Sequence, residues 1–196
     1  MDEYEKKLFK QHNYIAGVDE AGRGPLAGPV VAATVILPRN FKLEKLNDSK
    51  KLTKKQRDIM FDIINEQALA IGISIVNSKT IDKVNILNAT KQAMLESINN
   101  LDIKPDYVLI DHTPLDLDIP HESIVKGDSK SYTIAAASVI AKVTRDKIME
   151  ELDKEHPEYG FKNHKGYGTK AHKEALTKHG ITKYHRTSFK PVSEVM

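Results

Sequence analysis

Asn13-Tyr-Ile-Ala-Gly-Val-Asp19 is typical of a short β-strand, because its apolar and β-branched residues lead into a Gly-rich turn. The turn, Glu20-Ala-Gly-Arg-Gly24, is followed by a second β-branched run from Gly28 to Leu37, which ends at Pro38. Since so little chain separates the two runs, we expect them to pair as antiparallel strands. This pair is the starting point from which the rest of the fold is predicted.

Further along the chain, strands and helices alternate. Thr53 is expected to begin a helix with Gln56 as its capping-box partner, and Ile59, Ile63 and Ile64 are expected on its apolar face. The remaining patterns predict strands at 70–76, 107–111 and about 123–125, and helices at about 78–99, 131–155 and 169–180. A meander followed by alternating strands and helices predicts an α/β fold, a mixed β-sheet flanked by helices.

Composition bounds the kind of protein. The 196 residues, without repeats or Pro/Ser-rich linkers, predict one domain spanning 1–196. No apolar run approaches the roughly 20 residues that a membrane span requires, and the charged N-terminus shows no secretory signal. The chain has no cysteine, which excludes disulfides and thiolate metal sites and fits a cytoplasmic location.

Basic residues are concentrated near the C-terminus. Between Lys162 and Lys190 there are eight Lys or Arg and one acid, Glu174, so this stretch carries +7 and the remainder −4. A basic segment at about 160–190 attached to an acidic body suits a protein that holds phosphate with one part and metal with another. A lysine-rich helix face exposed to water is an equally good explanation of the charge alone.

Acidic residues stand at the ends of apolar segments, where they need a partner. Asp19 and Glu20 close the first strand, Asp111 closes the strand from Tyr107, and Asp146 ends an apolar stripe on the helix at 131–155. A turn cap or a surface salt bridge would explain Asp111 or Asp146 taken singly. Four converging carboxylates without cysteine would select Mg²⁺ or Mn²⁺, and two such ions can drive phosphodiester cleavage.

The glycines beside the first acids do not form a dinucleotide-binding fingerprint. Gly22 and Gly24 fit that pattern, but the third glycine is one position late and a strand follows where a helix should begin. The glycines do let the backbone approach a ligand closely, with Arg23 available for phosphate.

The run from Ile15 to Val30 closely resembles the signature of type 2 ribonuclease H, ribonuclease HII. Further agreement comes, in order, from Asn47-Asp-Ser-Lys-Lys-Leu-Thr, Val108-Leu-Ile-Asp, Lys126-Gly-Asp-Ser, Ala136-Ala-Ser-Val-Ile-Ala-Lys-Val-Thr-Arg-Asp, Tyr159-Gly-Phe and His164-Lys-Gly-Tyr-Gly-Thr. Together these stretches cover about 14–192 of the chain. The resemblance implies a ribonuclease H-like fold.

The resemblance also implies site residues and an activity. The four metal-binding acids of the family are carried onto Asp19, Glu20, Asp111 and Asp146, which hold two divalent ions, Mn²⁺ or Mg²⁺, during catalysis. Gly22, Arg23 and Gly24 would sense the ribose 2′-hydroxyl, which distinguishes RNA from DNA. The implied enzyme hydrolyses the RNA strand of RNA/DNA hybrids and cuts 5′ of single ribonucleotides in duplex DNA, leaving 3′-hydroxyl and 5′-phosphate ends. This activity would serve ribonucleotide excision repair.

Other substrate contacts are carried over in the same way. Tyr167 would stack on the sugar at the RNA-to-DNA step, although composition alone fits packing as well as stacking. Ser49 and Lys50, with Lys51, Lys126 and Ser129, are placed for phosphate contacts, and solvated side chains are the alternative. The eight histidines show no zinc-site spacing, and most are expected at the surface or at helix ends.

Two other functions compete with this interpretation. Ribonuclease HIII shares the fold but carries a different residue where Arg23 stands and adds an N-terminal platform domain. A catalytically silent nucleic-acid-binding module would have lost at least one of the four acids, and all four are present. The expected partner is the nucleic-acid duplex itself, bound by a monomer.

Overall fold

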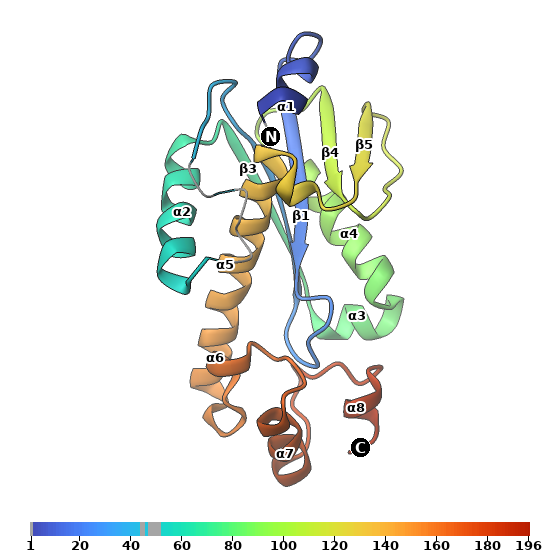
Figure 1. Ribbon diagram of the computed structural model, residues 1–196. Helices are drawn as coiled ribbons and strands as arrows, with labels where there is room; N and C mark the ends of the chain where they lie inside the picture. The colour runs from blue at the N-terminus through green and yellow to red at the C-terminus, as the bar shows by residue number, and fades with distance from the viewer. Residues whose placement is uncertain (1, 44–45, 47–51) are drawn as a thin grey trace.

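A five-stranded mixed sheet forms the centre of the molecule (Figure 1). The computed structural model describes residues 2–43, 46 and 52–196. Within these residues the strands follow the order β3-β2-β1-β4-β5. This arrangement confirms the predicted α/β class with a mixed sheet.

The antiparallel half of the sheet begins with the predicted pair. β1 (Ile15–Ala21) pairs antiparallel with β2 (Val30–Ile36), and β2 pairs antiparallel with β3 (Ala70–Val76). β1 extends two residues past the predicted end at Asp19, because Glu20 and Ala21 still pair with β2. Both acids of the motif are therefore held by the strand ladder and not by the turn.

The parallel half of the sheet carries the third acid. β4 (Tyr107–Asp111) runs parallel to β1, and β5 (His121–Ile124) runs parallel to β4. β4 has the predicted bounds, whereas β5 begins two residues before the predicted start at Ser123. Because β1 and β4 are parallel neighbours, their carboxyl ends meet at the same edge of the sheet.

Helices follow the predictions with two differences. α2 (Lys54–Gln67) begins with the predicted capping box between Thr53 and Gln56. Its apolar face is rotated from the predicted one, however: Met60 and Ile64 are buried, whereas Ile59 is 51% exposed. The single helix expected at 78–99 is two, α3 (Ser78–Val84) and α4 (Ile86–Asn99), because Asn85 adopts a positive φ of 67° that ends one helix and caps the next.

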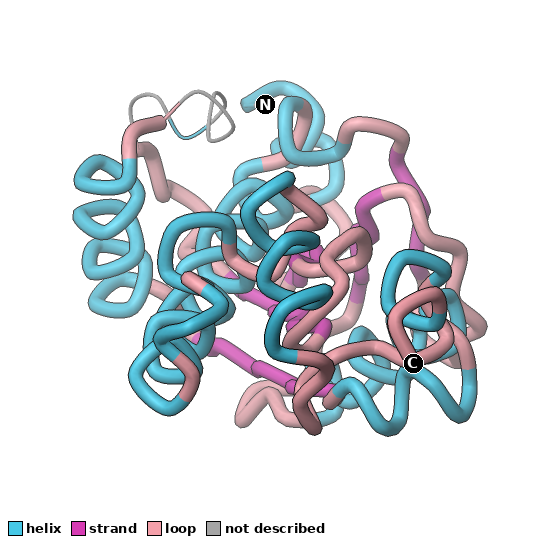
Figure 2. The backbone as a smooth tube through the Cα atoms, turned by 90° about the horizontal axis from the view of Figure 1, so that it is seen from below, coloured by secondary structure: helices cyan, strands magenta, loops and turns pink. Residues whose placement is uncertain are grey.

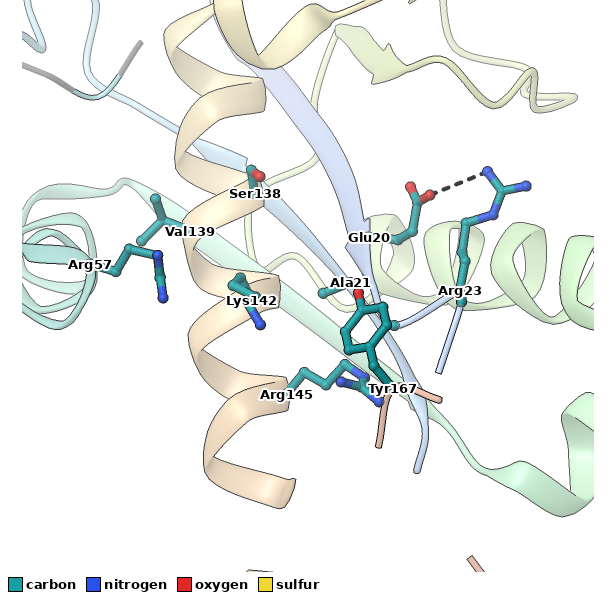
Figure 3. Close-up of a pocket in the computed structure, with 11 residues that line it drawn as sticks. Glu20, Ala21, Arg23, Arg57, Ser138, Val139, Lys142, Arg145 and Tyr167 are labelled. Atoms are coloured by element: carbon teal, nitrogen blue, oxygen red, sulfur yellow. Dashed lines mark hydrogen bonds and ion pairs between the residues drawn. The ribbon is translucent and has the colours of Figure 1, made fainter. Parts of the chain in front are cut away.

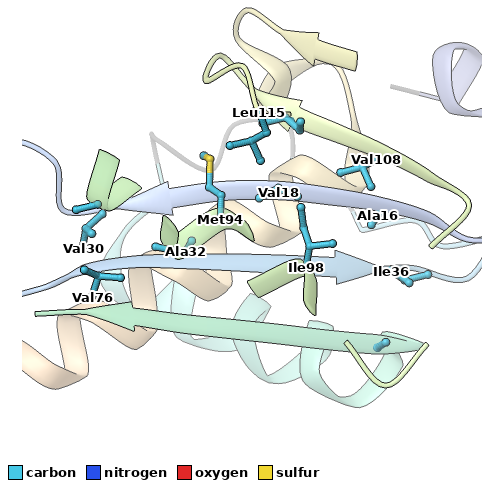
Figure 4. Packing of buried hydrophobic residues seen from close by; sticks show 14 of the residues in the cluster. Ala16, Val18, Val30, Ala32, Ile36, Val76, Met94, Ile98, Val108 and Leu115 are labelled. Carbon is cyan, nitrogen blue, oxygen red and sulfur yellow. The ribbon is translucent and has the colours of Figure 1, made fainter. Parts of the chain in front are cut away.

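Two helical layers cover the sheet. On one face α3 and α4 pack Ile81, Met94 and Ile98 against β1, β2 and β4, as Figure 4 shows for part of this cluster. On the other face lies α5 (Tyr132–Glu155), with α2 beyond it. α5 approaches β1 so closely that a Cβ on Gly17 would lie 2.1 Å from the backbone of Thr133. Only glycine permits this approach, which brings α5 alongside the acids of β1.

The N-terminal helix holds the start of α5 in place. α1 (Asp2–Leu8) brings the buried carboxylate of Glu5 to the first turn of α5. Glu5 Oε1 accepts hydrogen bonds from Ser131 Oγ at 2.6 Å and from the Thr133 amide at 3.0 Å. A carboxylate is favourable here because the N-terminus of a helix carries a partial positive charge.

The basic C-terminal segment is helical, as predicted. It contains η3 (Pro157–Tyr159), α6 (Phe161–His164), α7 (Lys170–His179) and α8 (Lys190–Ser193), gathered beyond one end of the sheet (Figures 1 and 2). Most histidines were expected at the surface or at helix ends, but His172 and His185 are buried, at 0% and 2% exposed. They pack among the rings of Tyr159 and Phe161. None of the described helices has the length and apolar character that crossing a membrane requires.

Candidate active site

Two of the predicted acids lie side by side at the carboxyl ends of β1 and β4. Val18 pairs with Ile110, and the next residues on the two strands are Asp19 and Asp111. Asp19 is 7% exposed, and its Oδ1 accepts a hydrogen bond of 2.7 Å from the Glu20 amide. Glu20 follows directly, so three of the four predicted acids are brought together at this edge of the sheet.

The three carboxylates share a poorly solvated environment. Burial raises the pKa of Asp19 well above its usual value, and the charges of Glu20 and Asp111 raise it further. A hydrogen bond from Ser138 on α5 opposes this increase. Burial also raises the pKa of Glu20, although the Arg23 guanidinium, 3.4 Å from Glu20 Oε1, acts against it. Three acids that disfavour one another's ionised form are stabilised by a cation placed among them.

The donor set fits a hard divalent ion. Glu20 Oε2 is buried and has no hydrogen-bond partner, which leaves a carboxylate oxygen able to take a cation. Oxygen-only ligands select Mg²⁺ or Mn²⁺ over softer metals. Among the described residues, no group of three or more His, Cys, Asp or Glu side chains is already arranged to hold a metal ion.

Asp146 is not brought to this group. Its Oδ1 accepts a 2.6 Å hydrogen bond from Lys142, and it lines a separate hollow with Arg57 and Glu150. Ser138, which contacts Asp19, lies two helical turns before Asp146 on α5. At 1.5 Å per residue this is about 12 Å along the helix axis, whereas paired catalytic ions sit about 4 Å apart. The apolar stripe predicted the face of α5 on which Asp146 lies, but not where along the helix the other acids meet α5.

Asp128 lies closer to the cluster than Asp146 does. It belongs to η2 (Gly127–Ser129), between β5 and α5, and is 6% exposed. The amide of the preceding residue, Gly127, donates a 2.7 Å hydrogen bond to Asp111 Oδ1. Lys126-Gly-Asp-Ser is part of the family pattern, but no role was predicted for its acid. The sequence feature that could have identified Asp128 is the position of this short motif just before the long helix α5.

A cavity of about 410 Å³ opens next to Glu20. Its lining includes the predicted recognition residues Gly22, Arg23, Gly24 and Tyr167. In Figure 3 the Tyr167 ring projects between the side chains of α5 and the Glu20–Arg23 ion pair. Tyr167 is 46% exposed, so its ring is available to a ligand as well as to the protein. The cavity thus places the Glu20 carboxylate beside a glycine-rich backbone and an aromatic face.

Comparison with known proteins identifies the family. The ribonuclease HII family model matches residues 16–192. The chain belongs to the ribonuclease HII family. The ribonuclease HII of Acetivibrio thermocellus is 58% identical over 188 residues, which are 95% of this chain and 73% of that relative. Membership makes the chain a ribonuclease H enzyme, a metal-dependent endonuclease that acts on RNA/DNA.

Solved structures agree on the ribonuclease H-like fold. Ribonuclease H2 of Pyrococcus horikoshii matches with a TM-score of 0.80 at 27% identity, covering 93% of this chain and 97% of the other. Bst-RNase HIII in complex with Mn²⁺ matches with a TM-score of 0.71 at 16% identity, covering 93% and 68%. The second likeness concerns the fold alone.

Two buried arginines shape the ribonuclease HII glycine-rich loop, and no role was predicted for either of them. Arg186 donates to the carbonyls of Gly22 at 2.6 Å, Arg23 at 2.9 Å and Gly28 at 2.9 and 3.0 Å. Arg145 donates to the carbonyls of Ala27, Pro29 and Lys165 at 2.9 to 3.1 Å. Burial lowers the pKa of Arg186 to about 9 and that of Arg145 to about 10. The carbonyl dipoles thus stabilise two buried positive charges, one of which, Arg145, also lines the cavity.

The remaining predicted substrate contacts are only partly described. Ser49, Lys50 and Lys51 lie outside the residues that the structure describes. Ser129 Oγ donates to the Lys126 carbonyl at 2.8 Å. Within the basic segment Arg186 is buried, and Lys165 is bound to Glu150 at 2.8 Å. The exposed lysines of α7, namely Lys170, Lys173 and Lys178, line a shallow hollow and carry the solvent-facing charge.

Proposed function

We propose that this enzyme cuts duplex DNA on the 5′ side of a single embedded ribonucleotide, and also hydrolyses RNA in RNA/DNA hybrids. The observation that carries the proposal is the position of Glu20. It belongs to the acidic group with Asp19 and Asp111 and also lines the cavity of Gly22, Arg23, Gly24 and Tyr167. A scissile phosphate bound there would therefore lie next to the residues that we propose recognise the ribose 2′-hydroxyl.

Each part of the site has its own role in this mechanism. Asp19, Glu20 and Asp111 would hold two divalent ions, which when bound activate water and stabilise the leaving 3′-oxygen. For the fourth ligand, predicted at Asp146, the geometry favours Asp128, because its neighbour Gly127 contacts Asp111 directly. Asp146 would then act on the substrate only indirectly, through its hydrogen bond with Lys142.

Ribonucleotide recognition would come from the loop and the tyrosine. The 2′-hydroxyl can both donate and accept, so backbone groups at Gly22 and Gly24 can read it where a deoxyribose offers nothing. Arg23, which is partly exposed, would hold the adjoining phosphate. The Tyr167 ring would stack on the sugar at the RNA-to-DNA step, and the lysines of α7 would contact the duplex backbone.

A comparison of three substrates tests this function. The purified protein with Mn²⁺ or Mg²⁺ is incubated with duplex DNA carrying one ribonucleotide, an RNA/DNA hybrid, and all-DNA duplex. We expect cleavage 5′ of the ribonucleotide with 3′-hydroxyl and 5′-phosphate ends, cleavage of the hybrid, and an intact all-DNA duplex. An Asp19→Asn variant controls for contaminating nucleases. Cleavage of the hybrid without cleavage at the single ribonucleotide would match ribonuclease HIII and overturn the proposal, as would no cleavage.

A further inference from the structure

Two buried histidines lie behind Tyr167 without any role in the proposed chemistry. His172 is on α7 and His185 follows it in the C-terminal segment, and their Nε2 atoms lie 3.1 Å apart. Both are essentially inaccessible to solvent. Two imidazoles in direct contact in a protein interior need defined protonation states, because each nitrogen must be either a donor or an acceptor.

The surrounding backbone fixes those states. The Thr182 amide donates to His185 Nδ1 at 2.9 Å, so this nitrogen must be an acceptor and the proton of His185 is on Nε2. His172 Nδ1 lies 3.0 Å from the Tyr167 carbonyl oxygen, which can only accept, so the proton of His172 is on Nδ1. The contact between the rings is then His185 Nε2–H donating to His172 Nε2. The hydrogen bonds therefore form one continuous chain in which each group donates to the next. This chain runs from the Thr182 amide through the rings of His185 and His172 to the Tyr167 carbonyl.

A metal at the two Nε2 atoms conflicts with this arrangement. Binding through Nε2 would move the His185 proton to Nδ1, where it would oppose the Thr182 amide proton. Burial lowers the pKa of both imidazoles, and the proximity of the two rings adds to the effect at His185. The neutral pair joined by one proton satisfies every polar atom of the chain.

The chain ends at the backbone of a residue whose side chain faces the cavity. Tyr167 contributes its ring to the cavity and its carbonyl to His172. On the other side of the same loop, the Gly166 amide donates to His164 Nδ1 at 3.2 Å, and His164 stacks on His172 with 4.6 Å between ring centroids. The Gly166 carbonyl accepts from the Leu26 amide at 2.8 Å. Hydrogen bonds on both sides therefore hold the loop of Gly166 and Tyr167 in place.

We propose that His172 and His185 are positioning residues that set the Tyr167 ring for ribonucleotide recognition through this one-way hydrogen-bond chain. The inference rests on the proposed function for the part played by Tyr167. The histidines touch neither substrate nor metal in this scheme. They act by fixing the backbone from which the ring projects, so that the ring meets the sugar without having to order a loop first.

The first test uses the unmodified enzyme and needs no activity. Nitrogen-15 NMR of the imidazole rings near neutral pH reports which nitrogen carries the proton. We expect His185 protonated on Nε2 and His172 on Nδ1, assigned with His172→Asn and His185→Asn spectra. The opposite tautomer at either ring, or a doubly protonated ring, would overturn the chain.

The second test separates positioning from general stability. His172→Leu removes the donor to Tyr167, whereas His172→Asn keeps an N–H close to the position of Nδ1. We expect His172→Leu to lower the rate at a single ribonucleotide about tenfold and His172→Asn to restore most of the loss. His179→Leu is the matched control, because His179 is exposed on the same helix and lies outside the chain. Equal losses for His172→Leu and His172→Asn in folded protein would overturn positioning.

The third test is a double-mutant cycle. In a Tyr167→Ala background, His172→Leu should cost less than about twofold, because the group through which it acts is gone. Fully additive losses would contradict the proposal. If Tyr167→Ala leaves the rate unchanged, the role of Tyr167 in the proposed function fails. If Tyr167→Ala lowers the rate and His172→Leu does not, only the positioning role fails. Should His172→Leu not fold, the tautomers of the unmodified enzyme still decide the question.

Discussion

Arg186 Nη2 lies 2.6 Å from the carbonyl oxygen of Gly22, a residue 164 positions earlier in the chain. The same guanidinium binds the carbonyls of Arg23 and Gly28. A planar group with five donors can hold a curved backbone in this way, and an ammonium cannot. The glycine-rich loop is therefore held in shape by a side chain that is distant from it in the sequence.

Replacing this arginine by lysine should damage both stability and activity. Arg186→Lys keeps the charge but loses the planar group that donates to several carbonyls at once. We therefore expect the free energy of unfolding to fall by roughly 3 kcal/mol. Cleavage at a single ribonucleotide should fall at temperatures where the variant is still folded. Urea unfolding and the cleavage assay measure the two effects. Arg39→Lys, an exposed arginine that binds His12 O and Asn13, is the control and should change neither.

Three aspartates can be ranked by one substitution. Asp111→Asn should abolish turnover while leaving folding and duplex binding intact, because it removes a ligand charge and little volume. Asp128→Asn should lower the rate by roughly 100-fold, and Asp146→Asn by less than about tenfold. Rates under single-turnover conditions, with duplex affinity measured separately, give the ranking. A larger loss at Asp146 than at Asp128 would restore Asp146 as the fourth ligand.

Divalent ions should stabilise the folded protein, since they relieve the repulsion among buried carboxylates. At a Mn²⁺ concentration 100 times the dissociation constant, the gain is about 2.7 kcal/mol, which corresponds to a rise of roughly 5–10 °C in Tm. Chelation should reverse the rise. Asp19→Asn should largely remove the response, and an equal rise in that variant would place the ion elsewhere.

Acid should destabilise the C-terminal segment through the buried histidine pair. Burial and the neighbouring His172 lower the pKa of His185 to about 4, from 6.5. The unfolded chain therefore binds more protons than the folded one between these values, so stability is fully present above pH 6.5 and declines as the pH falls toward 4. The total loss is of order 3 kcal/mol. Urea midpoints at pH 7 and pH 5 should differ less in His185→Asn, and an identical difference would refute the assignment.

Local pattern was enough to predict the strands and the proximity of three acids at one edge of the sheet. Asp19, Glu20 and Asp111 end apolar strands whose alternation and turn residues are visible in the sequence, and parallel pairing brings such ends together. Asp146 differs because it lies on a helix. An apolar stripe shows which side of the helix faces the sheet, but not which position along the helix lies beside the edge of the sheet. That position is set by the close contact at Gly17, which no periodicity reveals.

The supporting residues could not be predicted from local pattern. Arg186 lies in a basic stretch and has the composition of a surface cation, yet it is buried on carbonyls from a distant loop. His172 and His185 have no zinc-site spacing, and their partners are main-chain atoms that no motif specifies. Side chains that bind backbone carry a weak sequence signal, because any residue can supply the carbonyl.

The hydrogen bonds from Arg186 to the loop carbonyls also set an order of events during synthesis. The glycine-rich loop is translated well before its anchor, because Gly22 precedes Arg186 by 164 residues. Until Arg186 has been added, the carbonyls of Gly22, Arg23 and Gly28 lack the guanidinium that binds them in the folded protein. We therefore expect a nascent chain to gain ribose discrimination only after Arg186 has been added, which is later than the synthesis of β1 and β2, the two strands that the loop joins.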